Sequence, residues 1–260
     1  ESAEGTKLSG KIAGDGSLVL KLYYARNSYK VTYKYEGTVP TGASALPAEA
    51  TYKYGAEVKV AADATAPGYT FSGWDKKDFT MPADNVEISG SFTANENTAY
   101  KVEHYQQNLN DDGFTLKDTD NLTGTTDTEA KAEAKTYEGF TLDKTVAGTV
   151  ESGKIAGDGS LVLKLYYTRN SYKVTYEYEG TAPEGASELP AEATYKYQET
   201  VKVAPKVDVP GYTFDGWKWD GRKQNEDFAM PAKDVVLTGK FTAKDDTAYK
   251  VEHYQQNLND

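Results

Sequence analysis

A long internal repeat constrains the fold of this chain more than any other feature. Residues Ser9 to Tyr35 read SGKIAGDGSLVLKLYYARNSYKVTYKY, and the run returns from Ser152 to Tyr178 with only two substitutions. A second run, AYKVEHYQQNLND, begins at Ala99 and returns at Ala248. The chain is therefore predicted to be a tandem array of small units, and its ends indicate an excerpt of a longer array.

The two copies of the array differ in length at one place. The first copy reads WDKKDF from Trp74 to Phe79, whereas the second reads WKWDGRKQNEDF from Trp217 to Phe228. An insertion that leaves both flanks intact is typical of a surface loop. We therefore expect the additional residues to lie outside the core of the second copy.

Alternation of apolar and polar residues predicts strands in nearly every apolar run. Leu18, Leu20, Leu22 and Tyr24 share one face of a predicted strand, and the alternation resumes from Tyr29 to Tyr35. The segment from Thr126 to Lys135 fits either a helix with capping-box spacing or an alternating strand. We favour the strand, because an alternating VKV run occupies the matching place in the flanking units. The predicted fold class is mainly β, in tandem repeat domains arranged end to end as an elongated chain. Small β-grasp-like α+β or β units are the alternative.

Composition limits the classes of function. Of the 260 residues, 38% are hydrophobic and the mean hydropathy is −0.69, which is low for a single large core. The net charge of −11 argues against nucleic acid and against anionic membranes as partners. No apolar run reaches the length of a membrane span, and no signal peptide is apparent. The absence of cysteine excludes disulfides. Whether a Lys–Asn isopeptide bond replaces them stays open.

The reactive side chains do not form a recognisable catalytic or metal-binding pattern. His104 and His253 are the same repeat position on an alternating strand, so both are interpreted as structural residues. Neither zinc-ligand spacing nor a Ser-His-Asp set is present. The run from Asn108 to Gly113 has some features of a calcium loop, but Thr119 replaces the closing glutamate, so a plain turn is favoured. We predict no catalytic residue, no cofactor and no metal, and therefore a protein that is not an enzyme.

The three tryptophans are the remaining candidates for ligand contact, because an indole ring can stack on a sugar. Trp74 and Trp217 occupy matching GYTFxGW runs and are predicted to lie in the cores of their units. Trp219 lies in the insertion and has no counterpart. It is therefore the one candidate ligand contact that the sequence suggests.

Several joined blocks of sequence resemble known repeat families. The run SYKVTYEYEGTAPEGASELPAEATYKY from Ser171, followed by PGYTFDGW, resembles the SHIRT domain, named for streptococcal high-identity repeats in tandem. The run AYKVEHYQQNLNDDGFTL from Ala99 resembles mucin-binding-protein repeats. The PGYTFxGW motif is also similar to the Listeria–Bacteroides repeat, whose members have β-grasp-like folds. The LPAE runs at Leu46 and Leu189 lack the Thr-Gly step of a sortase signal.

These resemblances divide the chain into five predicted segments. Residues 27–98 and 170–247 are SHIRT-like domains, and residues 99–169 are a mucin-binding-like repeat. Residues 1–26 are the C-terminal part of such a mucin-binding-like repeat, and residues 248–260 are the start of another. The resemblance implies a cell-wall-anchored surface adhesin of a Gram-positive bacterium, outside the cell, whose stalk repeats hold a binding domain away from the wall.

Two functions are consistent with the sequence. The first is a mechanical spacer, which explains the near-identical copies and the lack of reactive clusters. The alternative is a weak carbohydrate or host-glycoprotein binder that gains strength through multivalency. The expected partners are the neighbouring repeats of the same chain and, in the alternative, host glycans or glycoproteins. We expect neither nucleic-acid binding nor membrane insertion, and a monomer with head-to-tail contacts through the two ends.

Overall fold

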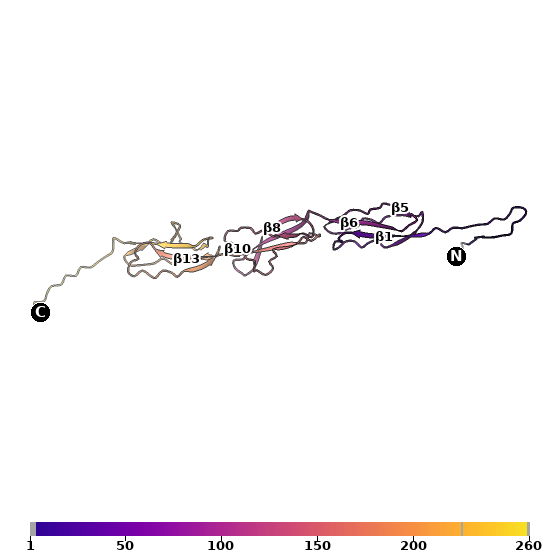
Figure 1. The fold of residues 1–260 in the computed structure, drawn as a ribbon. Coiled ribbons are helices and arrows are strands. Elements are labelled where there is room, and N and C mark those ends of the chain that lie inside the picture. The colour runs from indigo at the N-terminus through magenta and orange to yellow at the C-terminus, as the bar shows by residue number, and fades with distance from the viewer. Residues whose placement is uncertain (1–3, 225, 259–260) are drawn as a thin grey trace. The chain divides into compact units, whose positions relative to one another are not determined.

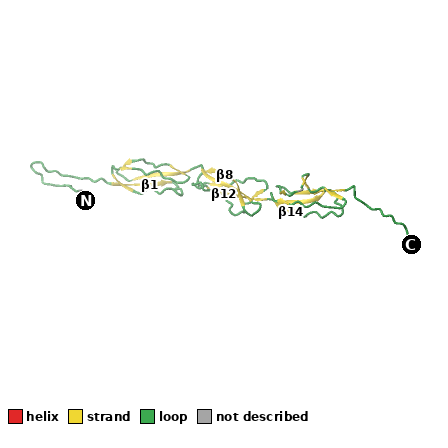
Figure 2. Cartoon of the chain, turned by 180° about the vertical axis from the view of Figure 1, so that it is seen from behind, coloured by secondary structure: helices red, strands yellow, loops and turns green. Residues whose placement is uncertain are grey.

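The computed structural model describes residues 4–224 and 226–258, and within these ranges the chain is all β. Its strands gather in small sheets that follow one another along the chain (Figures 1 and 2). None of the described residues forms a helix, so no membrane-spanning helix occurs among them. The predicted mainly β, tandem-repeat fold is confirmed for this part of the chain. The arrangement of the repeats end to end stays a prediction.

The chain divides into two compact units, which do not follow the predicted segment boundaries. The first repeat lies in unit 1 and the last in unit 2, while the residues of the middle repeat are divided between them. Unit 1 comprises Glu1–Tyr100, Asn121–Ala130 and Gly153–Leu161, and unit 2 comprises Lys101–Asp120, Lys131–Ser152 and Val162–Asp260. The five predicted segments remain a prediction.

The first repeat contains a four-stranded sheet in the order β2-β1-β6-β4. Strand β1 runs parallel to β6 with Val31 opposite Val86, and it pairs antiparallel with β2. A separate pair, β3 and β5, lies outside this sheet. The strands are β1 (Ser28–Glu36), β2 (Ala50–Lys53), β3 (Glu57–Val58), β4 (Tyr69–Phe71), β5 (Phe79–Thr80) and β6 (Val86–Ala94).

The core of the first repeat is thin and aromatic. Alternation along β1 places Val31 inside, where it packs with Val58, Met81 and Ile88. Tyrosines and Trp74 surround these aliphatic residues while remaining partly exposed. This arrangement explains why the chain contains many more tyrosines than phenylalanines: a tyrosine ring can cover a small core while its hydroxyl reaches water or a backbone carbonyl.

The middle repeat has a second four-stranded sheet in the order β10-β12-β7-β8, with β9 and β11 as a separate pair. Its central strands β7 and β12 run parallel, and Leu163 lies opposite Val102. The preferred strand within residues 126–135 is confirmed as β9. The strands are β7 (Thr98–Gln107), β8 (Phe114–Gly124), β9 (Glu129–Lys131), β10 (Phe140–Leu142), β11 (Ser152–Lys154) and β12 (Val162–Arg169).

The second long repeat reproduces the first with an added edge. Its sheet has the order β14-β13-β20-β17-β18, and β15–β19 and β16–β21 form separate pairs. The strands are β13 (Ser171–Tyr178), β14 (Ala193–Lys196), β15 (Thr200–Val201), β16 (Tyr212–Phe214), β17 (Lys218–Trp219), β18 (Arg222–Lys223), β19 (Phe228–Ala229), β20 (Val235–Gly239) and β21 (Phe241–Ala243). The insertion is thus not a plain loop: β17 and β18 pair antiparallel, and Lys218 pairs with Thr238 of β20.

The prediction of a strand from Leu18 to Tyr24 is wrong. Apart from one bridge between Lys7 and Lys21, residues 8–26 adopt no regular strand. The identical sequence does form a strand in the middle repeat, where β7 and β10 flank it on both sides. A single strand cannot satisfy its backbone hydrogen bonds by itself, so alternation alone does not fold it.

Candidate functional site

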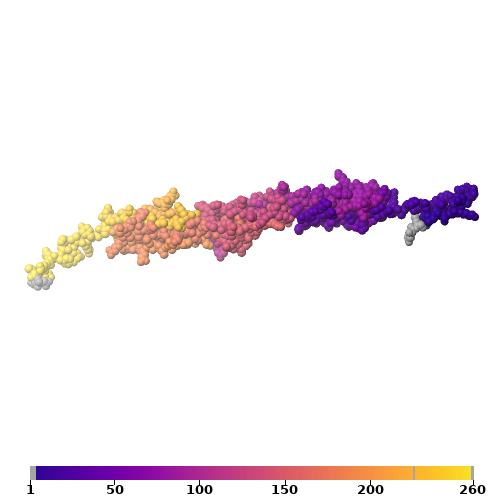
Figure 3. Space-filling view, viewed as in Figure 1, coloured from indigo at the N-terminus to yellow at the C-terminus, as the bar shows by residue number. Residues whose placement is uncertain are grey.

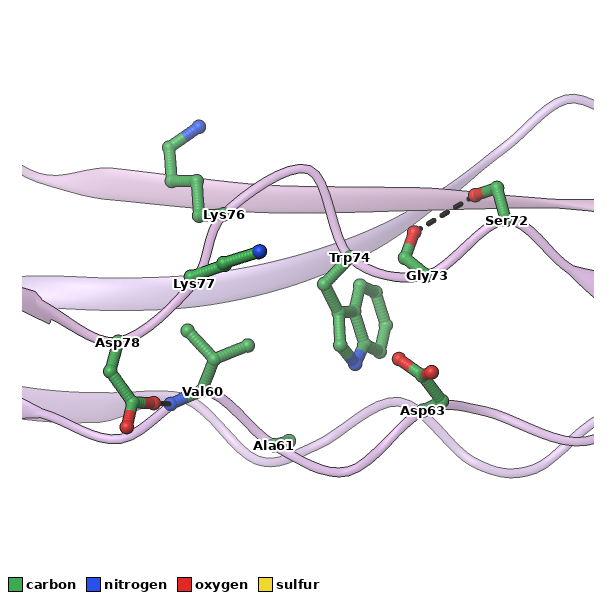
Figure 4. Close-up of a pocket in the computed structure, with 9 residues that line it drawn as sticks. All are labelled: Val60, Ala61, Asp63, Ser72, Gly73, Trp74, Lys76, Lys77 and Asp78. Carbon is green, nitrogen blue, oxygen red and sulfur yellow. Dashed lines mark hydrogen bonds between the residues drawn. The ribbon is translucent and has the colours of Figure 1, made fainter.

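A groove lies beside Trp74 in the first repeat. It has a volume of about 660 Å³ and is lined by Val60, Ala61, Asp63, Ser72, Gly73, Trp74, Lys76, Lys77 and Asp78. Figure 4 shows the indole ring pointing between the two strand-flanking loops, close to Asp63 and Val60. The loops are fixed locally, because Asp78 accepts a hydrogen bond of 2.9 Å from the Val60 backbone N–H.

The tryptophan of this groove belongs largely to the core. Its ring stacks on Tyr35 with centroids 5.8 Å apart and meets Phe71 edge-on at 4.9 Å. Its indole N–H donates to the carbonyl of Ala62 at 3.1 Å. Trp74 is therefore held on several sides, as the sequence predicted, and only part of the ring borders the groove.

Two exposed ion pairs border the groove. Lys76 pairs with Asp75 at 2.8 Å, and Lys59 pairs with Asp78 at the same distance. These hydrogen bonds from lysine hold the pKa values of both Asp75 and Asp78 below the usual range. Such exposed ion pairs bind water and polar groups but do not supply a desolvated acid or nucleophile. The groove is suited to weak polar contact rather than to catalysis.

The second long repeat has the same groove in a smaller form. Its volume is about 300 Å³, and Val203, Ala204, Trp217 and Asp227 take the places of the first-repeat residues. Trp217 donates its indole N–H to Pro205 and is only 2% exposed. Gln224 from the insertion lines the groove and donates its backbone N–H to the Trp217 carbonyl. The insertion therefore narrows the groove instead of opening it.

Trp219, the candidate ligand contact, is half-buried on strand β17. Its ring stacks on Phe228 with centroids 5.5 Å apart, and the Lys233 Nζ lies 5.3 Å from the ring centroid. It packs against the core of its repeat. The structure thus places Trp219 as a supporting residue of the added hairpin, with part of its surface still accessible.

The middle repeat contains a buried polar network that sequence reasoning identified only as a structural histidine. His104 is fully buried, and its ring nitrogens lie 3.0 Å from the Tyr167 hydroxyl and 3.0 Å from an Asp120 carboxylate oxygen. The Tyr167 hydroxyl also accepts the Lys135 backbone N–H at 2.9 Å. Lys135 Nζ in turn pairs with Asp120 at 2.7 Å.

The donors and acceptors of this network fix the histidine tautomer. A carboxylate only accepts, so the His104 nitrogen that faces Asp120, Nε2, carries the proton. In the neutral ring Nδ1 is then the acceptor, and the Tyr167 hydroxyl, which accepts from the Lys135 backbone N–H, donates its own proton to Nδ1. Burial raises the pKa of Tyr167, which keeps it a donor. Every member has a partner, and among the described residues no buried side-chain nitrogen or oxygen lacks one. The network therefore joins a buried histidine, whose ring nitrogens both have partners, to an ion pair that is partly exposed at the surface.

Neither a metal site nor a calcium loop is assembled in the described part of the chain. No group of three or more His, Cys, Asp or Glu side chains that could hold a metal occurs there. The run from Asn108 to Gly113 closes on itself: Asp111 accepts hydrogen bonds of 2.7 Å from the Asn108 side chain and from the Gly113 backbone. These contacts are those of a turn between β7 and β8. His253, the repeat counterpart of His104, is exposed and has no such network.

The joint between the middle repeat and the last repeat is built on Arg169. Only Asn170 separates β12 from β13. The Arg169 guanidinium donates to the carbonyls of Gln107 and Tyr197, each at 2.9 Å, and it lies over the ring of Phe140. One side chain thus binds backbone from both repeats within the same compact unit.

The joint between the first repeat and the middle repeat is a close backbone contact. Thr126 donates its hydroxyl to the Gly68 carbonyl at 2.9 Å, and Tyr69 donates to Asp127 at 2.6 Å. A Cβ built on Gly68, whose φ is +74°, would lie 2.4 Å from the Cα of Gly157. The short connector between β12 and β13 is apparent in the sequence, but the contacts across both joints are not, because they join residues dozens of positions apart.

Both long repeats match family models of repeat domains. Residues 29–100 match the family model described as Listeria-Bacteroides repeat domain. Residues 173–245 match the model described as Divergent InlB B-repeat domain. The two matches cover the segments that hold sheets β2-β1-β6-β4 and β14-β13-β20-β17-β18.

Three solved structures are similar to parts of the chain at low TM-scores. SHIRT domains 3-4 from a cell surface protein are 17% identical, with a TM-score of 0.22, covering 55% of this chain and 98% of that chain. Mub-RV is 14% identical, with a TM-score of 0.20, covering 56% and 99%. The Bacillus anthracis TIE protein is 10% identical, with a TM-score of 0.34, covering 84% and 51%. The family models show that the two long repeats of this β-rich tandem-repeat chain are similar to Listeria-Bacteroides and InlB B-repeat domains.

Proposed function

We propose that this chain is a non-catalytic spacer segment of a bacterial cell-surface adhesin, outside the cell, which projects a distal binding domain from the cell wall. The observation that carries the proposal is the Arg169 joint. A spacer must transmit position from one repeat to the next, and this requires joints that do not bend freely. A connector of one residue, bound on both sides by one guanidinium, meets that requirement.

Three further observations support the spacer. The first joint is also closed by hydrogen bonds and by contact between two glycines. The ion pairs beside the Trp74 groove are exposed and so do not supply a desolvated catalytic group. The two long repeats match models of repeat domains rather than of enzymes. Wall anchoring and a Gram-positive source are parts of the same proposal and follow from the resemblance of the sequence to surface repeats.

Small-angle scattering of the dilute chain tests the proposal. With strands that rise about 3.3 Å per residue, units laid end to end should give an elongated particle on the order of 100 Å long. Inserting about six Gly/Ser residues after Asn170 should broaden the distance distribution and leave the melting of each repeat unchanged. Arg169→Ala should broaden it less, with Arg26→Ala as the matched control. A compact particle, or an insertion without effect, would contradict the spacer.

A second function, weak binding of carbohydrate or host glycoprotein, is favoured by one observation. A tryptophan-lined groove recurs in both long repeats, and a weak site that recurs along an array gains strength through multivalency. The accessible part of Trp219 is the candidate contact in the second repeat. A glycan array with the intact chain and with Trp219→Ala separates the two functions. Binding that depends on Trp219 supports the binder, and equal signals from both chains count against this contact.

A further inference from the structure

In each repeat the first long strand and the last long strand lie next to each other inside the sheet. In the first repeat these strands are β1 and β6, which are neighbours although most of the repeat separates them in sequence (Figure 1). In the space-filling view the indigo and the purple residues of this repeat accordingly adjoin one another (Figure 3). Strands β7 and β12 are the corresponding pair in the middle repeat, and β13 and β20 in the last. A pull on the chain therefore reaches each sheet through its central pair.

All three central pairs are parallel. Six residue pairs are in register between β1 and β6, six between β7 and β12, and five between β13 and β20. When the two ends of a repeat are pulled apart, the first strand is drawn toward its N-terminus and the second toward its C-terminus. Because the strands point the same way, these two pulls oppose each other along one axis and shear the pair, so its hydrogen bonds are loaded together. An antiparallel hairpin pulled at its two open ends instead separates one bond at a time.

Polar side chains extend the central pairs of both long repeats beyond their backbone ladders. At the start of β1 the Lys30 backbone N–H donates to the Asn85 side chain at 2.8 Å. At the start of β13 the Lys173 backbone N–H donates to the Asp234 carboxylate, also at 2.8 Å. Asn85 and Asp234 each directly precede the second strand of the pair. Each of these contacts adds one hydrogen bond to those that a shearing force has to break.

The hydrophobic core covers one face of each central pair. Val31 of β1 and Ile88 of β6 are 2% and 0% exposed, and Val174 of β13 and Leu237 of β20 are 1% and 0% exposed. A hydrogen bond under load breaks more easily when a water molecule can take the place of one partner. Because the core excludes water from this face, the loaded bonds are exchanged for water only from the opposite face.

We propose that the repeats bear tension, and that the central parallel pair of each repeat is the clamp that resists a pull along the chain. This function goes beyond the proposed spacer, because a segment that holds a distance does not thereby withstand a pull. The connectors pass tension from one clamp to the next with little slack: three residues separate β6 from β7, and one separates β12 from β13. The clamp does not depend on stiff joints, so the two proposals can fail separately.

Single-molecule pulling of the full chain in two directions tests the clamp of the first repeat. Attachment through Lys30→Cys and Thr93→Cys loads β1 and β6 in shear. Attachment through Lys30→Cys and Glu87→Cys loads one end of the same pair, so the two strands peel apart. The three side chains are exposed, and the natural sequence has no cysteine to compete. At equal pulling speed the repeat should unfold at a several-fold higher force in shear, and equal forces in the two directions would overturn the proposal.

Two substitutions in one core separate resistance to force from resistance to heat. Val31 in β1 and Val58 in β3 are buried in the same cluster, but β3 lies outside the central pair. Val31→Ala and Val58→Ala should lower the melting temperature of the repeat by similar amounts, since each removes the same two methyl groups. In the shear attachment, Val31→Ala should lower the unfolding force clearly more than Val58→Ala, because forced unfolding follows the unfolding rate and not the equilibrium stability. Equal losses of force would show that the whole core resists the pull and would refute the clamp.

Discussion

Removal of the Tyr167 hydroxyl should destabilise the middle repeat by a predictable amount. Tyr167→Phe keeps the ring, which packs against Tyr137, and removes only the oxygen. That oxygen donates to His104 Nδ1 and accepts from the Lys135 backbone N–H. His104 is fully buried, so its acceptor is left without a partner and without water.

The magnitude follows from the cost of unsatisfied polar groups. A buried group that loses its partner costs about 1–3 kcal/mol, and the lost hydrogen bond from the Lys135 backbone N–H adds about 1 kcal/mol. The expected loss of unfolding free energy is therefore about 2–4 kcal/mol. Since every 1.4 kcal/mol corresponds to a factor of ten, amides of β7 and β12 that exchange through opening of the repeat should exchange roughly 30- to 700-fold faster.

The chain supplies a matched control for this experiment. Tyr24 has the same fifteen preceding residues as Tyr167 but is 88% exposed. Tyr24→Phe should leave hydrogen exchange in every repeat unchanged. If Tyr167→Phe changed exchange in β7 by less than about threefold, or if both substitutions had equal effects, the network would contribute nothing to stability and the argument from unsatisfied groups would fail.

Three further predictions concern other parts of the molecule. Leu163→Ala should cost the middle repeat about 2–5 kcal/mol in urea unfolding, whereas Leu20→Ala, in identical sequence, should cost nothing measurable. Gly68→Ala should destabilise the joint between the first and middle repeats more than Gly211→Ala destabilises the matching place in the last repeat. Both glycines have positive φ, but only at Gly68 would the added Cβ lie 2.4 Å from another backbone atom. Local hydrogen exchange at the two places measures the difference. The hydrogen bond from lysine holds the pKa of Asp120 below its usual 3.8. Since the pKa of Asp120 is lower in the folded chain than in the unfolded one, this carboxylate stabilises the repeat above about pH 4, and its contribution is lost as the pH falls further. Melting curves from pH 6 to pH 2 should therefore show a smaller drop in melting temperature for Asp120→Asn than for the intact chain.

Much of the fold was readable from local pattern. Alternation located β1, β7 and β12, because one buried face and one solvated face impose a period of two. The strand favoured in residues 126–135 also appeared as β9, where Ala130 points into the core. Alternation did not predict the order of the strands in the sheet. Strand β1 lies between β2 and β6, and its parallel pairing with β6 joins residues that are far apart in sequence.

The candidate site was predicted less well than the fold. The insertion was expected as a loop with an exposed Trp219, but β17 and β18 form a hairpin that attaches to β20. The ring stacks on Phe228 and so is half-buried. The partners of His104 were also invisible, since Asp120 and Tyr167 lie on two other strands. Periodicity indicates which face a residue occupies, but it does not say which side chain lies opposite.

Residues 9–24 and 152–167 separate what sequence determines from what tertiary structure decides. Their sixteen letters are identical, and so are their propensity and alternation. In one place Leu163 is completely buried within a strand, and in the other Leu20 is half exposed on a segment without one. Sequence determined that the segment is able to be a strand and which face is apolar. Whether the strand forms is decided by β7 and β10, because their backbone groups supply the hydrogen bonds and their side chains cover the apolar face.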